Sequence, residues 1–298
     1  MRNSGMGSAA RNLAGVLAVL GLLARHASAQ MLDVSGTAFD VDLHGNIYVL
    51  DAGKNTLRLY DKSGALLRDV GGPGWLDGQF DRPSAVWARN GIDVFVADYG
   101  NHRIERFDRS LNFVSSFATR ESDNPDERFG YPSGVALSRL GELFICDTED
   151  SRIVKVDRFS TVERTFGEGG GGGHLASPSS VATGPKDAVY VLDGARVAAF
   201  DAFGNYLRDL MPGLLVHPSA FYADNDVVAV LDSSAVFFFD ADERPAGAVR
   251  TGAVLPAGGD IRAVALSGGS LYLLTGEGIF RTVDPRRGGS LENNPNSH

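Results

Sequence analysis

Residues 131–157 read YPSGVALSRLGELFICDTEDSRIVKVD and contain the repeating unit of this chain. Pro132 opens an apolar run, a turn follows, and a second apolar run ends at Asp147. The second run is apolar at every position before Asp147, which is typical of a strand buried on both faces. A third run ends at Asp157. The stretch therefore predicts a meander of short strands rather than a helix.

The same spacing recurs along the whole chain. Pro and Asp lie fifteen residues apart in three copies and fourteen apart in a fourth: Pro83 to Asp98, Pro132 to Asp147, Pro178 to Asp193, and Pro218 to Asp232. Gly36 to Asp51 keeps the spacing with Gly in place of Pro, and Asp260 to Thr275 keeps it with both markers lost. A self-similar period of 39 to 49 residues made of short strands indicates radial repetition, as in a β-propeller.

Each copy contains more than two strands. The third run ends in Asp in all six copies, at Asp61, Asp108, Asp157, Asp201, Asp240 and Asp284. A weaker fourth run follows in the first five copies. We therefore expect an all-β, six-bladed β-propeller of four-stranded antiparallel blades. The sixth copy has no fourth run of its own, and Gln30–Val34 is the candidate to complete it from the N-terminal side.

Two phrases resemble a known repeat family. Residues 94–108, VFVADYGNHRIERFD, contain Asn101-His102-Arg103-Ile104, and this phrase and residues 131–157 are similar to NHL repeats. The resemblance extends over residues 34–284, is strong in the first three copies and fades in the last two, which lack the basic residue after the second strand. It implies the same six-bladed propeller and a role in binding rather than one fixed chemistry.

The two ends of the chain differ from the repeats. Residues 1–29 combine early Arg residues, a short apolar run and the small residues Ala27-Ser28-Ala29, which predicts a signal peptide cleaved before Gln30. We thus expect a propeller over residues 30–284, a disordered polar tail over 285–298, and an exported protein, periplasmic or secreted, with no membrane span after cleavage.

Cleavage changes the net charge from −9 to −12, which argues against a nucleic-acid partner. Cys146 is expected to be a buried apolar residue without a disulfide.

Strand alternation assigns the loops to two faces. The loops between second and third strands and the connections between blades share one face, here the top face; the other turns share the bottom face. The Asp residues that end the second strands are expected to be structural, because a feature repeated in five blades is rarely catalytic. The candidate binding residues lie on the top face and are Tyr99, Asn101, His102, Arg103, Arg152, His174 and His217. Arg103 and Arg152 are also expected to pair with the structural Asp residues.

The favoured function is a non-enzymatic, monomeric scaffold that binds a protein or another extracellular ligand through these top-face loops. The alternative is a metal-dependent hydrolase, lactonase or lyase with a site at the central channel. It follows from similarity to peptidyl-hydroxyglycine lyases, which use zinc, and to gluconolactonase-like propellers, which use calcium. No residue is assigned as catalytic, none as a metal ligand, and no cofactor is assigned to the favoured function.

Overall fold

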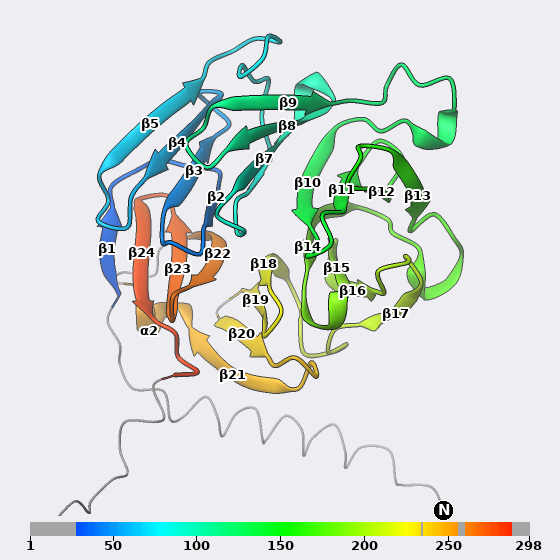
Figure 1. The fold of residues 1–298 in the computed structure, drawn as a ribbon. Coiled ribbons are helices and arrows are strands. Elements are labelled where there is room, and N and C mark those ends of the chain that lie inside the picture. The colour runs from blue at the N-terminus through cyan, green and yellow to red at the C-terminus, as the bar shows by residue number, and fades with distance from the viewer. Residues whose placement is uncertain (1–27, 234, 256–259, 288–298) are drawn as a thin grey trace, which may run out of the picture.

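The computed structural model describes residues 28–233, 235–255 and 260–287. Six four-stranded antiparallel sheets are arranged as blades around a central axis (Figure 1). The predicted fold class is therefore confirmed. Most of the expected signal peptide and most of the expected polar tail lie outside the described residues.

Each of the first five blades takes four consecutive strands. Blade I comprises β2 (Ala38–Val41), β3 (Ile47–Asp51), β4 (Thr56–Tyr60) and β5 (Leu66–Gly71). Blade II comprises β6 (Ala85–Trp87), β7 (Asp93–Asp98), β8 (Arg103–Asp108) and β9 (Phe113–Phe117). Blade III comprises β10 (Pro132–Leu137), β11 (Leu143–Asp147), β12 (Arg152–Val156) and β13 (Val162–Phe166).

Blade IV comprises β14 (Pro178–Thr183), β15 (Val189–Asp193), β16 (Arg196–Phe200) and β17 (Tyr206–Asp209). Blade V comprises β18 (Pro218–Ala223), β19 (Val228–Asp232), β20 (Ala235–Phe239) and β21 (Pro245–Arg250).

The helical elements are single turns: η1 (Tyr99–Asn101), η2 (Pro125–Glu127), η3 (Gly171–Gly173), η4 (Pro185–Asp187) and α2 (Thr251–Val254). All of them lie in turns or in connections between blades.

Blade VI is completed by the N-terminal side of the chain. It contains β22 (Ile261–Ser267), β23 (Ser270–Thr275) and β24 (Gly278–Val283), and β1 (Ala29–Leu32) pairs antiparallel with β24. The expected closure from the N-terminal side is thus observed, with the strand at Ala29–Leu32 rather than Gln30–Val34. The pairing is close: a Cβ at Gly278 would lie 2.0 Å from the Leu32 carbonyl oxygen, at a backbone φ of +136° that only glycine adopts readily.

The core lies within and between the blades. The second strands β3, β11, β15 and β19 are buried along their whole length, as the continuous apolar runs predicted. The first strands of neighbouring blades contact one another and therefore surround the axis. Phe80, Phe129 and Leu175, each three residues before the Pro of its repeat, are fully buried, which fits packing between blades.

The turns between the third and fourth strands, on the bottom face, share one hydrogen-bond pattern. The Asp that ends the third strand region accepts hydrogen bonds from backbone N–H groups two and four residues further on, as Asp108 Oδ1 does from Ser110 and Asn112. Asp61, Asp157, Asp201 and Asp240 do the same. These carboxylates stabilise their own turns and leave little acceptor capacity for a ligand.

Candidate functional site

Arg103 and Arg152 lie inside the protein rather than on its surface. Arg103 Nε is 2.9 Å from Asp98 Oδ2, and Arg152 Nε is 3.0 Å from Asp147 Oδ2, so the expected Asp–Arg pairs are present. Both arginines are less than one-tenth exposed. Their use as contact residues was predicted from the motif, but the structure places them beneath the top face, where they act on neighbouring loops.

Arg103 holds the connection between blades I and II. Its guanidinium donates to the carbonyl oxygens of Trp75 at 2.9 Å, Leu76 at 3.1 Å and Gln79 at 2.7 Å. Asn101 Nδ2 donates to the carbonyl oxygen of Gly74 at 2.8 Å. These bonds fix residues 72–80, here called the Trp75 loop, against blade II. Asn101 and Arg103 are therefore positioning residues for a loop that sequence reasoning did not single out.

The Trp75 loop displays two large apolar side chains. Trp75 is 77% exposed and Leu76 is 63% exposed, although their backbone is held rigidly by Arg103. Large apolar side chains are common on surfaces singly, but an exposed Trp on a fixed loop is unusual. The signal available in the sequence was the Gly-Pro-Gly-Trp-Leu order of residues 72–76, in which a Gly-Pro-Gly turn precedes an apolar pair.

Tyr99 and His102 form a cluster with residues of blade III. The His102 ring packs edge-on against the Tyr131 ring with centroids 4.3 Å apart, and Tyr99 lies 5.2 Å from the same ring. Arg120 Nη1 lies 3.2 Å from His102 Nδ1 and 3.0 Å from Glu149 Oε2. We call these five residues the top-face cluster. The sequence predicted Tyr99 and His102 but not Tyr131, Arg120 or Glu149, which only the blade II–III junction brings to them.

The environment of His102 disfavours its protonated form. Burial lowers the pKa of His102, and the positive charge of Arg120 lowers it further. His102 Nδ1 also accepts a hydrogen bond from the Tyr131 backbone N–H at 3.2 Å. The ring is therefore neutral at neutral pH, with Nδ1 as acceptor, and it contributes an aromatic edge rather than a charge.

His174 and His217 are exposed residues on other top-face connections. The His217 backbone N–H donates to Asp232 Oδ1 at 3.0 Å, and Arg196 donates to the His174 carbonyl oxygen. No hydrogen bond or ring contact joins the side chains of His102, His174 and His217 in the described part of the chain. The structure thus does not gather the predicted histidines into one site.

Two further properties of the described residues concern metal binding and membrane insertion. In residues 28–233, 235–255 and 260–287, no group of three or more His, Cys, Asp or Glu side chains is arranged to hold a metal ion. Within those ranges, no helix is long and apolar enough to cross a membrane. Cys146 is fully buried, and burial raises the pKa of its thiol, so it is an inert core residue as expected.

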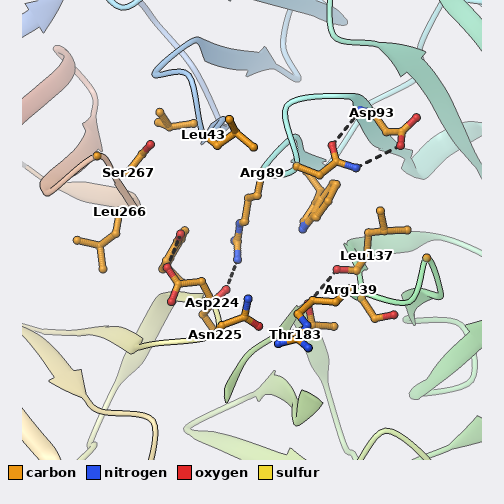
Figure 2. A pocket seen from close by; sticks show the side chains of 18 residues that line it. Leu43, Arg89, Asp93, Leu137, Arg139, Thr183, Asp224, Asn225, Leu266 and Ser267 are labelled. Carbon is orange, nitrogen blue, oxygen red and sulfur yellow. Dashed lines mark hydrogen bonds between the residues drawn. The ribbon is translucent and has the colours of Figure 1, made fainter. Parts of the chain in front are cut away.

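On the bottom face, Arg89 reaches across the central channel (Figure 2). It leaves the turn after β6, lies 3.2 Å from Asp40 of blade I, and donates to the Ala223 carbonyl oxygen of blade V. Its guanidinium stacks on the Tyr222 ring at 4.2 Å. Burial raises the pKa of Asp40, although the charge of Arg89 opposes this. Arg89 thus ties three blades together, an interaction that the sequence could not reveal because Arg89 and Ala223 are 134 residues apart.

Comparison with known proteins supports the repeat assignment. A family model described as the NHL repeat matches residues 129–156. Protein brain tumor of Drosophila melanogaster is 30% identical over 139 residues, which make up 45% of this chain and 13% of that protein. The chain therefore corresponds to only a small part of the length of this curated relative.

Solved structures with the same architecture have little sequence in common with this chain. A streptogramin B lyase has a TM-score of 0.58 at 11% identity, over 86% of this chain and 96% of that one. A catalytically inactive virginiamycin B lyase from Staphylococcus aureus, solved with quinupristin, has a TM-score of 0.57 at 11% identity, over 88% of each chain. PorZ, a surface component of the type-IX secretion system of Porphyromonas gingivalis, has a TM-score of 0.58 at 10% identity, over 85% of this chain and 31% of that one.

At identities of 10% to 12%, these solved structures show a shared fold but give no information about the chemistry of this chain. The repeat match falls on the stretch that sets the spacing of the whole chain, and the six sheets supply the architecture. The chain folds as a six-bladed β-propeller and contains an NHL repeat at residues 129–156.

Proposed function

We propose that this chain is an exported, non-enzymatic scaffold that binds a partner protein through its top face. The observation that carries the proposal is Trp75, which is 77% exposed while its carbonyl oxygen is held at 2.9 Å by Arg103. Trp, Tyr and Arg are the residue types that most often dominate binding energy at protein interfaces. A loop that is already rigid loses little conformational freedom when a partner docks.

The top-face cluster adds to this surface. Tyr99, His102 and Tyr131 present aromatic edges, and Arg82, at the end of the connection that carries the Trp75 loop, lies 5.6 Å from the Tyr99 ring. The contact surface we propose therefore runs from the Trp75 loop to the blade II–III junction. Arg103, Asn101 and Arg152 support it from below.

The metal-dependent alternative gains no support from the geometry. The described residues contain no cluster of His, Cys, Asp or Glu on which a calcium or zinc site could be built. The lyases named above are similar to this chain in fold alone, at 11% to 12% identity, so their activity is not carried over to it.

Site-specific photocrosslinking tests the proposal. A benzophenone amino acid is placed at Leu76 of the exported protein, which we expect to begin at Gln30, in its native host. We expect one crosslinked adduct of defined mass, lost when Trp75 is changed to Ala. The matched control carries the crosslinker at Val114, which is half-exposed on the outer strand β9 and should give no such adduct.

An adduct that survives Trp75→Ala, or no adduct above the Val114 control, would refute the top-face proposal. Cell fractionation and intact-mass measurement of the same protein test export separately. We expect the extracytoplasmic fraction to contain a chain that starts at Gln30, whereas a full-length cytoplasmic chain would contradict export.

A further inference from the structure

The bottom face contains two hollows that adjoin. The larger, about 590 Å³, lies at the mouth of the central channel and is lined by Trp87, Arg89 and Leu137 among others (Figure 2). The smaller, about 200 Å³, lies between blades II and III and is lined by Phe95, Phe117 and Leu143 among others. Asp93, Leu137 and Gly141 line both hollows. Together they form one groove, here called the bottom groove, which leads from the axis outward between two blades.

Exposed apolar side chains surround the bottom groove. Leu43, Ile92 and Leu140 stand at the first-to-second turns of blades I, II and III and are 60%, 67% and 69% exposed. Phe159, on the third-to-fourth turn of blade III, is 72% exposed. Leu43 lines the larger hollow, but Ile92, Leu140 and Phe159 line neither hollow, so an occupant confined to the hollows would leave these three side chains in water. A segment that extends beyond the hollows would cover them, and such apolar groupings commonly mark interaction sites.

Two exposed arginines, Arg139 and Arg158, stand at the blade III rim of the groove, and Asp224, which lines the channel mouth, accepts hydrogen bonds from Tyr222 and from two backbone amides. Asp93 accepts hydrogen bonds from Arg106 at 2.9 and 2.7 Å, and Asp157 accepts from the amides of its own turn. Arg139 is exposed and its ion pair with exposed Asp187 is 3.8 Å long. Arg158 stacks on Phe159 at 4.8 Å and makes no ion pair among the described residues. Arg139 and Arg158 are thus the exposed cations that an acidic segment would meet at the blade III rim.

We propose that the bottom groove binds an extended segment of a partner protein in which acidic and apolar side chains alternate. Successive side chains of an extended segment point to opposite sides, so the apolar ones would enter the two hollows. The acidic ones would then lie at the rim, opposite Arg139 and Arg158. A flat lipid surface would cover the apolar rim but would leave both hollows unfilled, so the shape favours a peptide. The proposal is independent of the top-face surface.

The protein carries its own reporter for this groove. It has two tryptophans: Trp75 on the top face and Trp87 in the lining of the channel mouth. In a Trp75→Phe variant, all tryptophan emission comes from Trp87. The probe is a displayed library of random twelve-residue peptides, panned on the mature protein and then tested as purified peptides. We expect enrichment of peptides that alternate Asp or Glu with apolar residues, and a change in Trp87 emission when they bind.

Variants that remove positive charge from the rim of the bottom groove test how the bound peptide is oriented. The double variant Arg139→Ser/Arg158→Ser should weaken peptide binding about tenfold and reduce its salt dependence, because each exposed charge pair contributes modestly and is screened. Both side chains are exposed, so the fold should be unaffected. The matched control is Arg109→Ser, an exposed arginine on the bottom face of blade II that lines neither hollow. It should leave the affinity unchanged.

Three outcomes would overturn the proposal. These are the absence of enriched peptides, binding that the double variant does not weaken, and binding to phosphatidylserine vesicles in place of peptides. The two proposals can fail independently. The top-face proposal is tested by Trp75 and the Leu76 crosslink, and the bottom-groove proposal is tested by peptide binding and Trp87 emission.

Discussion

The Asp that ends the second strand makes different hydrogen-bond networks in blade III and in blade V. In blade III, Asp147 accepts from the Gly130 N–H at 3.1 Å and pairs with Arg152, which also donates to the Arg128 carbonyl oxygen at 2.6 Å. In blade V, Asp232 accepts from the backbone N–H groups of Val216 and His217 at 2.6 and 3.0 Å. In the part of the chain that the structure describes, Asp232 has no arginine partner.

The Asp and the Arg of the repeat motif therefore have two separate structural roles. In blades II to V this Asp accepts hydrogen bonds from N–H groups of the connection that leads into the blade, as Asp98 does from Asp81 and Asp193 from Ala176. The Arg holds the carbonyl oxygens of that connection. Blades II, III and IV use both halves, and blade V uses only the first. The Asp is therefore the architectural constant, and the Arg adds rigidity to particular top-face connections.

Asp147→Ala should have the largest effect on stability. It removes the most buried carboxylate beside the Arg152 guanidinium, which keeps its contacts with Asp150 and Glu168, and it leaves the Gly130 N–H without its partner. Breaking a buried ion pair costs about 3 to 5 kcal/mol, and the two remaining carboxylates place this variant at the lower end of that range. Urea unfolding at pH 7 measures the change against Asp123→Ala, an exposed residue that should change stability by less than about 0.5 kcal/mol. Equal effects of the two substitutions would contradict the structural role of the pair.

Glu105→Gln should change stability in a way that depends on pH. Glu105 lies beside Arg103 in blade II, and blades III and IV place other residues there. Burial raises the pKa of Glu105 to about 7 from its usual 4.5, although Arg103 opposes this, and its Oε2 atom has no hydrogen-bond partner in the structure as described.

Because the folded-state pKa is the higher one, the wild type loses stability as pH rises from the unfolded value through about 7. Glutamine does not ionise. The variant should therefore match the wild type near pH 4 and exceed it by at most about 3 kcal/mol at pH 8, since each pKa unit corresponds to about 1.4 kcal/mol. Parallel stability curves for the two proteins between pH 4 and pH 8 would show that Glu105 does not titrate in this range.

Asp232→Ala should destabilise the protein less than Asp147→Ala does. It removes hydrogen bonds to two backbone N–H groups but leaves no buried charge. Unpaired donors near the surface cost about 1 to 3 kcal/mol, and water can satisfy part of the demand. The same urea titration gives the value. A loss as large as that of Asp147→Ala would mean that the Arg contributes nothing to the difference between the blades.

Gly194→Ala should have the smallest effect. Blade IV joins β15 to β16 by the two residues Gly194 and Ala195, and Gly194 has a φ of +58°. A Cβ there would meet no atom within 4 Å, so only the left-handed backbone conformation opposes the change. The cost should be about 1 kcal/mol. Thermal unfolding checks it against Gly213→Ala, a second glycine with positive φ and open space around it, which should behave alike.

Much of the fold could be predicted because its signal is local and repeated. The distance from Pro132 to Asp147 and its copies fixes where the first two strands of a blade begin and end, and apolar runs buried on both faces leave no helical alternative. The blade V and VI strands were predicted from the spacing and the apolar pattern more than from the motif. The position of β1 was less certain, because nothing in Ala29–Leu32 states that its partner is β24.

The candidate site could be predicted only in part, because it depends on neighbouring blades. Tyr99 and His102 stand within one repeat phrase and were found, whereas Tyr131, Arg120 and Glu149 reach them from other segments. The motif also suggested that Arg103 and Arg152 were free for a partner. Burial decides that question, and burial depends on how the connection from the preceding blade folds over the arginine.

The pairing of β1 with β24 has a consequence for the timing of folding. Residues 29–32 leave the ribosome before any other strand of the propeller, yet their partner, residues 278–283, is made last. Contacts between segments so distant in sequence form slowly, because a long loop must close first. Until then β24 and β1 are both unpaired edges, open to association with other chains. The ring can therefore close only after its last blade has been synthesised, and until then protection of these two edges limits association with other chains.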